Sequence, residues 1–190
     1  ETAIEGVFVL EPVVHGDNRG YFLESYNKST HEDLDLQYDF TQDNESFSSR
    51  GVLRGLHYQT GDNSQAKLLR VIKGEVKDIV VDIRQDSPFY GETVSVILSE
   101  ENKRQLLIPR GFAHGFVVLS ETALFSYKCD NFYNRESEGT INPLCPKLNL
   151  DWGIEGALIK LSEKDKMAPN FGSHLKSDVK FKSNSIDKKD

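Results

Sequence analysis

The sequence predicts an all-β protein, a sandwich or barrel of antiparallel strands with few helices. Three observations support this fold class: many short runs rich in β-branched and aromatic residues, turn residues between the runs, and weak helical periodicity. Short strands at close spacing are typical of such folds. The expected strands are, in chain order, 6–11, 21–25, 38–45, 52–58, 67–72, 75–83, 92–98, 105–108, 115–119 and 123–129.

Turn residues separate the expected strands. Gly74 lies between two of them, Ser87-Pro88 ends another, and Pro109-Arg110-Gly111 predicts a turn before the next. Helical patterns are short, and we expect residues 30–35 and 100–104 each to form one turn of helix.

Composition sets the broad class of the protein. The 190 residues are 37% apolar and 28% charged, which predicts one domain over residues 1–172 and a solvated, partly mobile lysine-rich tail over 173–190. The net charge of −7 argues against nucleic acid as a partner. No signal peptide or apolar run long enough for a membrane span is visible. Cys129 and Cys145 form no CxxC pair, so we expect two reduced thiols in a cytoplasmic protein.

The first segment that carries chemically reactive side chains is Arg54-Gly55-Leu56-His57-Tyr58-Gln59, and Gln65-Ala66-Lys67 follows it. Side chains two apart on a strand share a face, so His57 and Gln59 point the same way. If that face is the barrel interior, an imidazole and an amide lie in an enclosed pocket. Strict alternation puts Arg54 on the other face, and a bulge at Gly55 would correct this.

The second segment runs from Ile108 to Phe116, and its Pro-Arg-Gly turn precedes His114. Together the two segments resemble the two cupin motifs, in which a PxGxxH turn follows an earlier strand histidine. Metal-binding cupins also carry a histidine where this chain has Gln59, a poor ligand for a divalent transition metal. His57 and His114 alone fall short of the three protein ligands of a catalytic zinc site. We therefore expect neither metal nor cofactor.

Eight short motifs then make the resemblance more specific. They are DNRGYF at 17–22, QDNES at 42–46, GVLRGLHYQ at 51–59, QAK at 65–67, DIR at 82–84, PRGFAHGF at 109–116, YKC at 127–129 and LSEKD at 161–165. In this order and spacing, from about residue 6 to residue 169, the chain resembles the dTDP-4-dehydrorhamnose 3,5-epimerase family. The chain departs from the family's pattern at 140–146, where none of the implied catalytic positions lies.

The resemblance implies a cupin-like jelly-roll β-barrel and a reaction. Such an enzyme converts dTDP-4-dehydro-6-deoxy-D-glucose to dTDP-4-dehydro-L-rhamnose without a cofactor, by removing and returning protons at C3 and C5 beside the C4 ketone. This chemistry needs a base on one face of the sugar and an acid on the other, and the enolate oxygen must be stabilised.

The resemblance also assigns catalytic roles. His57 matches the base, and a free imidazole, whose pKa is about 6.5, is mostly neutral at pH 7. Asp165 matches the carboxylate that orients it. Tyr127 matches the proton donor on the opposite face, because a phenol stays protonated at neutral pH. Lys67 matches the cation that stabilises the enolate oxygen.

The remaining matched positions imply substrate contacts. They are Arg19, Glu24, Gln42, Arg54, His114, Tyr133, Glu138 and Lys164. Tyr133 matches the ring that stacks on the nucleotide base, and arginine is suited to a diphosphate because its fork binds oxygens in pairs. The resemblance further implies a homodimer in which N-terminal strands pair across the interface, with Arg19 or Glu24 reaching the partner's pocket.

Three alternatives remain open from the sequence. A mono-epimerase would act at C3 or C5 alone, or on another nucleotide-linked 4-keto sugar. A non-catalytic sugar-binding cupin would be expected to lack His57 or Tyr127, and both are present. A metal-dependent cupin oxygenase is disfavoured by Gln59.

Overall fold

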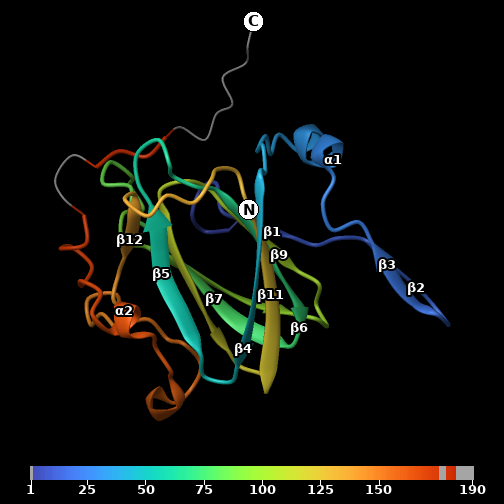
Figure 1. Ribbon diagram of the computed structural model, residues 1–190. Helices are drawn as coiled ribbons and strands as arrows, with labels where there is room; N and C mark the ends of the chain where they lie inside the picture. The colour runs from blue at the N-terminus through green and yellow to red at the C-terminus, as the bar shows by residue number, and fades with distance from the viewer. Residues whose placement is uncertain (1, 176–178, 183–190) are drawn as a thin grey trace, which may run out of the picture.

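Two five-stranded antiparallel sheets and a separate hairpin form the computed structural model, which describes residues 2–175 and 179–182 (Figure 1). The first sheet has the order β1 (Phe8–Leu10), β9 (Gln105–Ile108), β6 (Lys67–Lys73), β11 (Thr122–Cys129) and β4 (Gln42–Ser49). The second has the order β12 (Glu138–Thr140), β5 (Leu53–Gln59), β10 (Phe112–Val118), β7 (Glu75–Asp82) and β8 (Thr93–Ser99). The all-β class is confirmed, and the antiparallel sheets form the cupin-like jelly roll that the resemblance implied.

Apolar side chains from both sheets form the main core between them. Leu69 of β6 and Phe125 of β11 meet Val80 of β7 and Phe116 of β10, and all four are almost fully buried. The rings of Phe116 and Phe125 stack with centroids 4.1 Å apart. This packing joins the two sheets and leaves their ends free to form a pocket.

The second sheet is buried on its other face as well. Alternate residues of the same strands, such as Ile79 and Val81, pack with Trp152 and Phe171 of the C-terminal segment. That segment includes the 3-10 helix η1 (Gly156–Leu158) and α2 (Glu163–Lys166), and it lies on the β5 and β12 side (Figure 1). Burial of both faces explains the nearly continuous apolar sequence of β7.

The expected tail divides between described and undescribed residues. Residues 176–178 and 183–190 lie outside the described part of the chain. Of the described ones, Leu175 and Phe181 pack against the second core cluster, and Phe181 forms an isolated bridge with Gly61.

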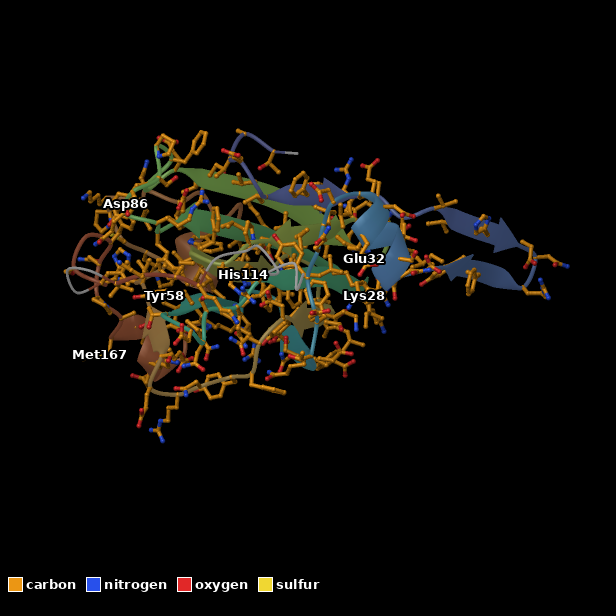
Figure 2. All side chains as sticks on the ribbon, turned by 90° about the horizontal axis from the view of Figure 1, so that it is seen from above. Lys28, Glu32, Tyr58, Asp86, His114 and Met167 are labelled. Atoms are coloured by element: carbon orange, nitrogen blue, oxygen red, sulfur yellow. The ribbon has the colours of Figure 1, made fainter. Side chains whose placement is uncertain are left out.

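The hairpin β2 (Val14–Asp17) and β3 (Gly20–Leu23) projects from the body of the molecule, beyond α1 (Lys28–Asp33) (Figures 1 and 2). Its apolar side chains face solvent, with Tyr21 58% and Phe22 70% exposed. Exposed aromatic residues on a protruding arm are typical of a surface that binds another chain.

Several element boundaries differ from the sequence predictions. The strand expected at 38–45 begins at Gln42, because Tyr38 and Phe40 pack in a separate cluster with Leu68 and Leu107. The strand expected at 115–119 begins at Phe112. The helical turn expected at 100–104 is wrong. Ser99 and Asn102 there exchange hydrogen bonds across a tight turn.

Four elements were missed because they are short and carry little pattern. They are β2, β12, η1 and α2. No helix within the described residues is long and apolar enough to cross a bilayer.

Candidate active site

A pocket of about 300 Å³ opens at one end of the two sheets. Its lining comes from both sheets and from the segments that connect them, namely Gln42, Asn44, His57, Tyr58, Gln59, Gln65, Lys67, Tyr127, Cys129, Tyr133 and Glu138. His57 belongs to β5 of the second sheet, whereas Lys67 and Tyr127 belong to β6 and β11 of the first. The imidazole and the phenol therefore reach the pocket from different sheets.

His57 is held by a carboxylate from the C-terminal segment. Its Nε2 lies 2.7 Å from Oδ1 of Asp165, which is almost fully buried. The other carboxylate oxygen accepts a hydrogen bond of 2.9 Å from Ser162 Oγ. Burial alone would raise the pKa of Asp165, but the hydrogen bonds from His57 and Ser162 hold it below its ordinary value. Asp165 is thus an ionised partner that fixes the ring of His57.

The first sheet supplies a half-buried ammonium beside a phenol to the pocket. Lys67 Nζ lies 5.9 Å from the ring centroid of Tyr127, and burial lowers the pKa of Lys67. Burial raises the pKa of Tyr127, so its hydroxyl keeps its proton at neutral pH. Cys129 lies opposite Lys67 in the β6–β11 pairing, and burial raises the pKa of its thiol to about 11. The thiol therefore stays protonated at neutral pH and lacks the thiolate that a cysteine nucleophile needs.

His114 lies deeper than His57 and does not line the pocket. The two histidines are cross-strand partners on β10 and β5, and Figure 2 shows His114 inside the body of the molecule. Its Nε2 lies 2.8 Å from Oδ2 of the fully buried Asp78, and burial lowers its pKa. His114 therefore lies beside His57 in the sheet and is not among the residues that line the pocket.

Besides Gln42, two of the predicted substrate contacts, Tyr133 and Glu138, line the pocket, and a third, Lys164, is paired with Glu138. Lys164 Nζ lies 2.6 Å from Glu138 Oε1, and Tyr133 Oη donates to Glu138 Oε2 at 3.2 Å. Burial pushes the pKa of Glu138 upward, but its hydrogen bond with Lys164 leaves it below the ordinary value. Tyr133 is 53% exposed, so its ring is available at the entrance.

Besides His114 and Lys164, three further predicted contacts do not line this pocket within one chain. Arg19 lies in the turn of the projecting hairpin, paired with Asp17, and Glu24 follows β3. Arg54 is exposed, and its Nε donates to Ser48 Oγ at 3.1 Å. A register shift opposite Arg54 and His57 marks an irregularity at Gly55, where the sequence suggested a bulge.

Several polar residues near the site, including Asn44 and Tyr58 of the lining, were not among the predicted site residues. Asp78 is the carboxylate that pairs with His114, and Ser162 hydrogen-bonds the carboxylate that pairs with His57. Gln59 and Gln65 line the pocket. Asp78 lies on a β-strand, where an isolated acid carries no sequence signal of its own. Ser162 could have been found, because Ser-x-x-Asp before a short helix resembles an N-cap motif.

The other three histidines match no motif of the family, and we expected all of them at the surface. His15 is exposed, but the prediction is wrong for His31, which is buried in α1 against Tyr26. His174 is half-buried and stacks on Phe171, and burial lowers its pKa to about 4. Neither lines the pocket, but Tyr58, which does, donates a hydrogen bond of 2.8 Å to the carbonyl of His174.

In both His57 and His114, one ring nitrogen lies within hydrogen-bond distance of a carboxylate oxygen. Among the described residues, no group of three or more histidine, cysteine, aspartate or glutamate side chains is arranged to hold a metal ion. Cys129 and Cys145 are both free and buried.

Comparison with known proteins places this chain among nucleotide-sugar enzymes. A family model described as dTDP-4-dehydrorhamnose 3,5-epimerase matches residues 1–173. The dTDP-4-dehydrorhamnose 3,5-epimerase of Salmonella typhimurium is 53% identical over 170 residues, which cover 89% of this chain and 92% of that protein.

Solved structures agree with this match. The crystal structure of dTDP-4-dehydrorhamnose 3,5-epimerase from Elizabethkingia anophelis NUHP1 aligns with a TM-score of 0.86 at 52% identity, covering 90% of this chain and 94% of that one. The enzyme of Legionella pneumophila Philadelphia 1, solved in complex with dTDP-4-keto-L-rhamnose, aligns with a TM-score of 0.85 at 50% identity, covering 89% of each chain.

Proposed function

This chain belongs to the dTDP-4-dehydrorhamnose 3,5-epimerase family, and we propose from its pocket which residues carry out the family's reaction. The protein is an isomerase that acts on a dTDP-linked 4-keto sugar and epimerises it at C3 and C5. One observation carries the assignment of roles: a histidine held by a buried carboxylate and a protonated tyrosine enter one pocket from different sheets.

His57 acts as the base. With Nε2 donating to Asp165, the neutral ring keeps its lone pair on Nδ1, the nitrogen that accepts a proton from the sugar. The carboxylate of Asp165 stabilises the imidazolium that results. The C4 carbonyl makes the adjacent C–H acidic, so one base beside it serves at C3 and then at C5.

Lys67 and Tyr127 complete the proton transfer. When His57 takes the proton, the electron pair of the C–H bond moves into the ring and places negative charge on the C4 oxygen. The ammonium of Lys67, half-buried in the same pocket, stabilises that charge strongly because the surroundings are poorly solvated. Tyr127 then donates its phenolic proton to the opposite face of the carbon, which inverts the centre. Solvent reprotonates the phenolate and takes the proton from the His57 imidazolium, so both groups are ready for the next step.

The rim of the pocket binds the nucleotide part of the substrate. Tyr133 stacks on the base, and Lys164 and Arg54 supply positive charge for the diphosphate. Gln42, Glu138 and His114 complete the contacts, with His114 acting from behind His57.

The assembly is a homodimer in which the N-terminal strands pair across the interface. The projecting hairpin with exposed Tyr21 and Phe22 supports this, because Arg19 lies in its turn and Glu24 directly after it, and neither lines the pocket of its own chain. In the dimer they reach the partner's pocket. Sedimentation of the wild-type chain and of Phe22→Asp tests this, since the variant should become monomeric and lose activity. A wild-type monomer with full activity would contradict the dimer.

We further propose one epimerase domain over residues 1–172 and a cytoplasmic location. The two free, buried thiols are consistent with a reducing compartment. Fractionation of cells producing the protein tests the location.

Exchange of hydrogen in deuterated water tests the function. Incubation of the pure protein with dTDP-4-dehydro-6-deoxy-D-glucose should place deuterium at both C3 and C5, as read by mass spectrometry and NMR. Label at one carbon alone would identify a mono-epimerase. Binding without exchange would identify a sugar-binding protein that does no chemistry.

A further inference from the structure

Three glutamine side chains bind four consecutive backbone positions of the segment that carries Tyr133. Gln65 Nε2 donates to the carbonyl of Asn131 at 2.8 Å. Gln59 Nε2 donates to the carbonyl of Phe132 at 3.3 Å, and Gln59 Oε1 accepts from the N–H of Asn134 at 2.6 Å.

The third glutamine completes the set. Gln42 Oε1 accepts from the N–H of Tyr133 at 3.0 Å. All three glutamines line the pocket, and we call them with their four bonds the glutamine cradle.

The cradle holds a segment that crosses from one sheet to the other. Residues 130–137 connect β11 of the first sheet to β12 of the second. Gln42 is the cross-strand partner of Cys129 at the end of β11, and Gln59 is the partner of Glu138 at the start of β12. The segment is therefore fixed near both of its ends by the sheet that it leaves and the sheet that it enters.

Such anchoring is unusual for so exposed a segment. Phe132 is 66% and Tyr133 is 53% exposed, and water would satisfy the polar groups of an exposed loop without help from side chains. Gln59, in contrast, is 6% exposed and uses both ends of its amide, since Nε2 also donates to the carbonyl of Asn63 at 2.8 Å. A buried amide with its donors and acceptor satisfied by backbone fixes the position of that backbone.

We infer that Gln59 and Gln65 are positioning residues, which preorganise the backbone around Tyr133 so that its ring is in place before the nucleotide base binds. This inference rests on the proposed function, because it takes Tyr133 as the ring on which the base stacks. A loop ordered in advance loses less conformational entropy on binding, so the cradle increases affinity for the base without touching it. In this chain the amide at the second cupin metal-ligand position holds a recognition loop.

We predict a loss of binding affinity that is confined to the nucleotide base of the ligand. Gln59→Met keeps the length of the side chain and removes its hydrogen bonds. The Kd for dTDP and the KM for the substrate should rise about tenfold, while kcat stays within about twofold, because His57, Lys67 and Tyr127 are untouched. Gln65→Met, which removes one bond, should raise the same constants about threefold.

Inorganic pyrophosphate separates positioning from general damage, because it lacks the base. Its affinity, measured by calorimetry or competition, should be the same in the wild type and both variants. Hydrogen exchange gives a second readout, since the Asn134 amide should exchange faster in Gln59→Met. Gln85→Met, at an exposed glutamine outside the pocket, is the matched control and should change none of these values.

Three outcomes would overturn the inference. They are an unchanged dTDP affinity in Gln59→Met, an equal loss of dTDP and pyrophosphate affinity, and unchanged exchange at Asn134. If Gln59→Met does not fold, the two affinity outcomes apply to Gln65→Met. A wild-type chain that fails to bind dTDP would instead contradict the proposed function itself.

Discussion

Nε2 of His57 lies 2.7 Å from Oδ1 of Asp165, although 108 residues separate the two in sequence. The histidine belongs to a central strand of the second sheet, and the aspartate to the four-residue helix α2. The contact forms because the C-terminal segment packs back over that sheet, where Trp152 and Phe171 anchor it. The pair that we propose as the base and its carboxylate partner thus depends on the packing of the C-terminal segment.

Replacing His57 by Asn should abolish proton removal. The asparagine amide is not basic enough to take a proton from carbon, so deuterium incorporation at C3 should fall by at least about 10²-fold. Affinity for dTDP should remain within about twofold, because the ring faces the sugar end of the pocket. Mass spectrometry and calorimetry measure the two quantities. Exchange at the wild-type rate would show that another group is the base.

Ser162→Ala should weaken the same pair indirectly. Ser162 accepts from the Asp165 N–H at the start of α2 and donates to Asp165 Oδ2, so its loss removes a helix cap and a hydrogen bond to the carboxylate. We expect about 1 kcal/mol lower stability in chemical denaturation. We also expect the acid limb of the kcat/KM profile to move, because the carboxylate that supports His57 is less well held.

Ser162→Thr keeps the hydroxyl and is the matched control for that experiment. It should restore both the stability and the pH profile. A Ser162→Ala variant that loses stability while its pH profile stays unchanged would limit Ser162 to capping the helix.

Activity should fall at alkaline pH as Lys67 loses its proton. Burial lowers the pKa of Lys67 and raises that of Tyr127, so burial moves the ionisation of the lysine toward neutral pH and that of the phenol away from it. The lysine stabilises the enolate only while charged, so C3 exchange declines as the pH passes through its pKa. In Tyr127→Phe, C5 inversion should be lost, whereas the alkaline limb of any remaining C3 exchange should stay at the same pH.

Tyr90→Phe, at a tyrosine outside the pocket, is the control for Tyr127→Phe and should keep the full reaction. Disappearance of the alkaline limb in Tyr127→Phe would assign that ionisation to the phenol instead of the lysine.

Gly55→Ala should displace the base. Gly55 has φ of +129°, and an added Cβ would lie 2.5 Å from the Cα of Gly115 in the neighbouring strand. Relief requires β5 and β10 to separate beside His57, so we expect roughly 2 kcal/mol lower stability and loss of exchange. Gly156→Ala, where the added Cβ meets nothing within 4 Å, should leave thermal melting and activity unchanged. Equal melting of the two variants would contradict this account.

The sequence predicted strands best where burial is strong. The strand at 105–108 was predicted with its observed ends, and those near 52–58, 67–72, 75–83 and 123–129 were predicted to within about two residues at each end. These strands contribute apolar residues to the cores, so their patterns follow their positions. The prediction at 38–45 was displaced, because the aromatic residues at its start pack in a separate small cluster instead of forming a strand. The strand β4 that follows them is polar and half exposed, so its pattern is weak.

Residue types and spacing alone thus determined the all-β class, and the motifs indicated the family. They also indicated that His57, Lys67 and Tyr127 belong to one site. Only the tertiary structure decided how these groups meet, because two sheets supply the pocket's walls and a distant helix supplies Asp165. The glutamine cradle could not be predicted from the sequence either, since hydrogen bonds from side chains to the backbone leave no periodic pattern. Patterns along a chain record burial, whereas contacts between distant polar groups exist only after the sheets have packed.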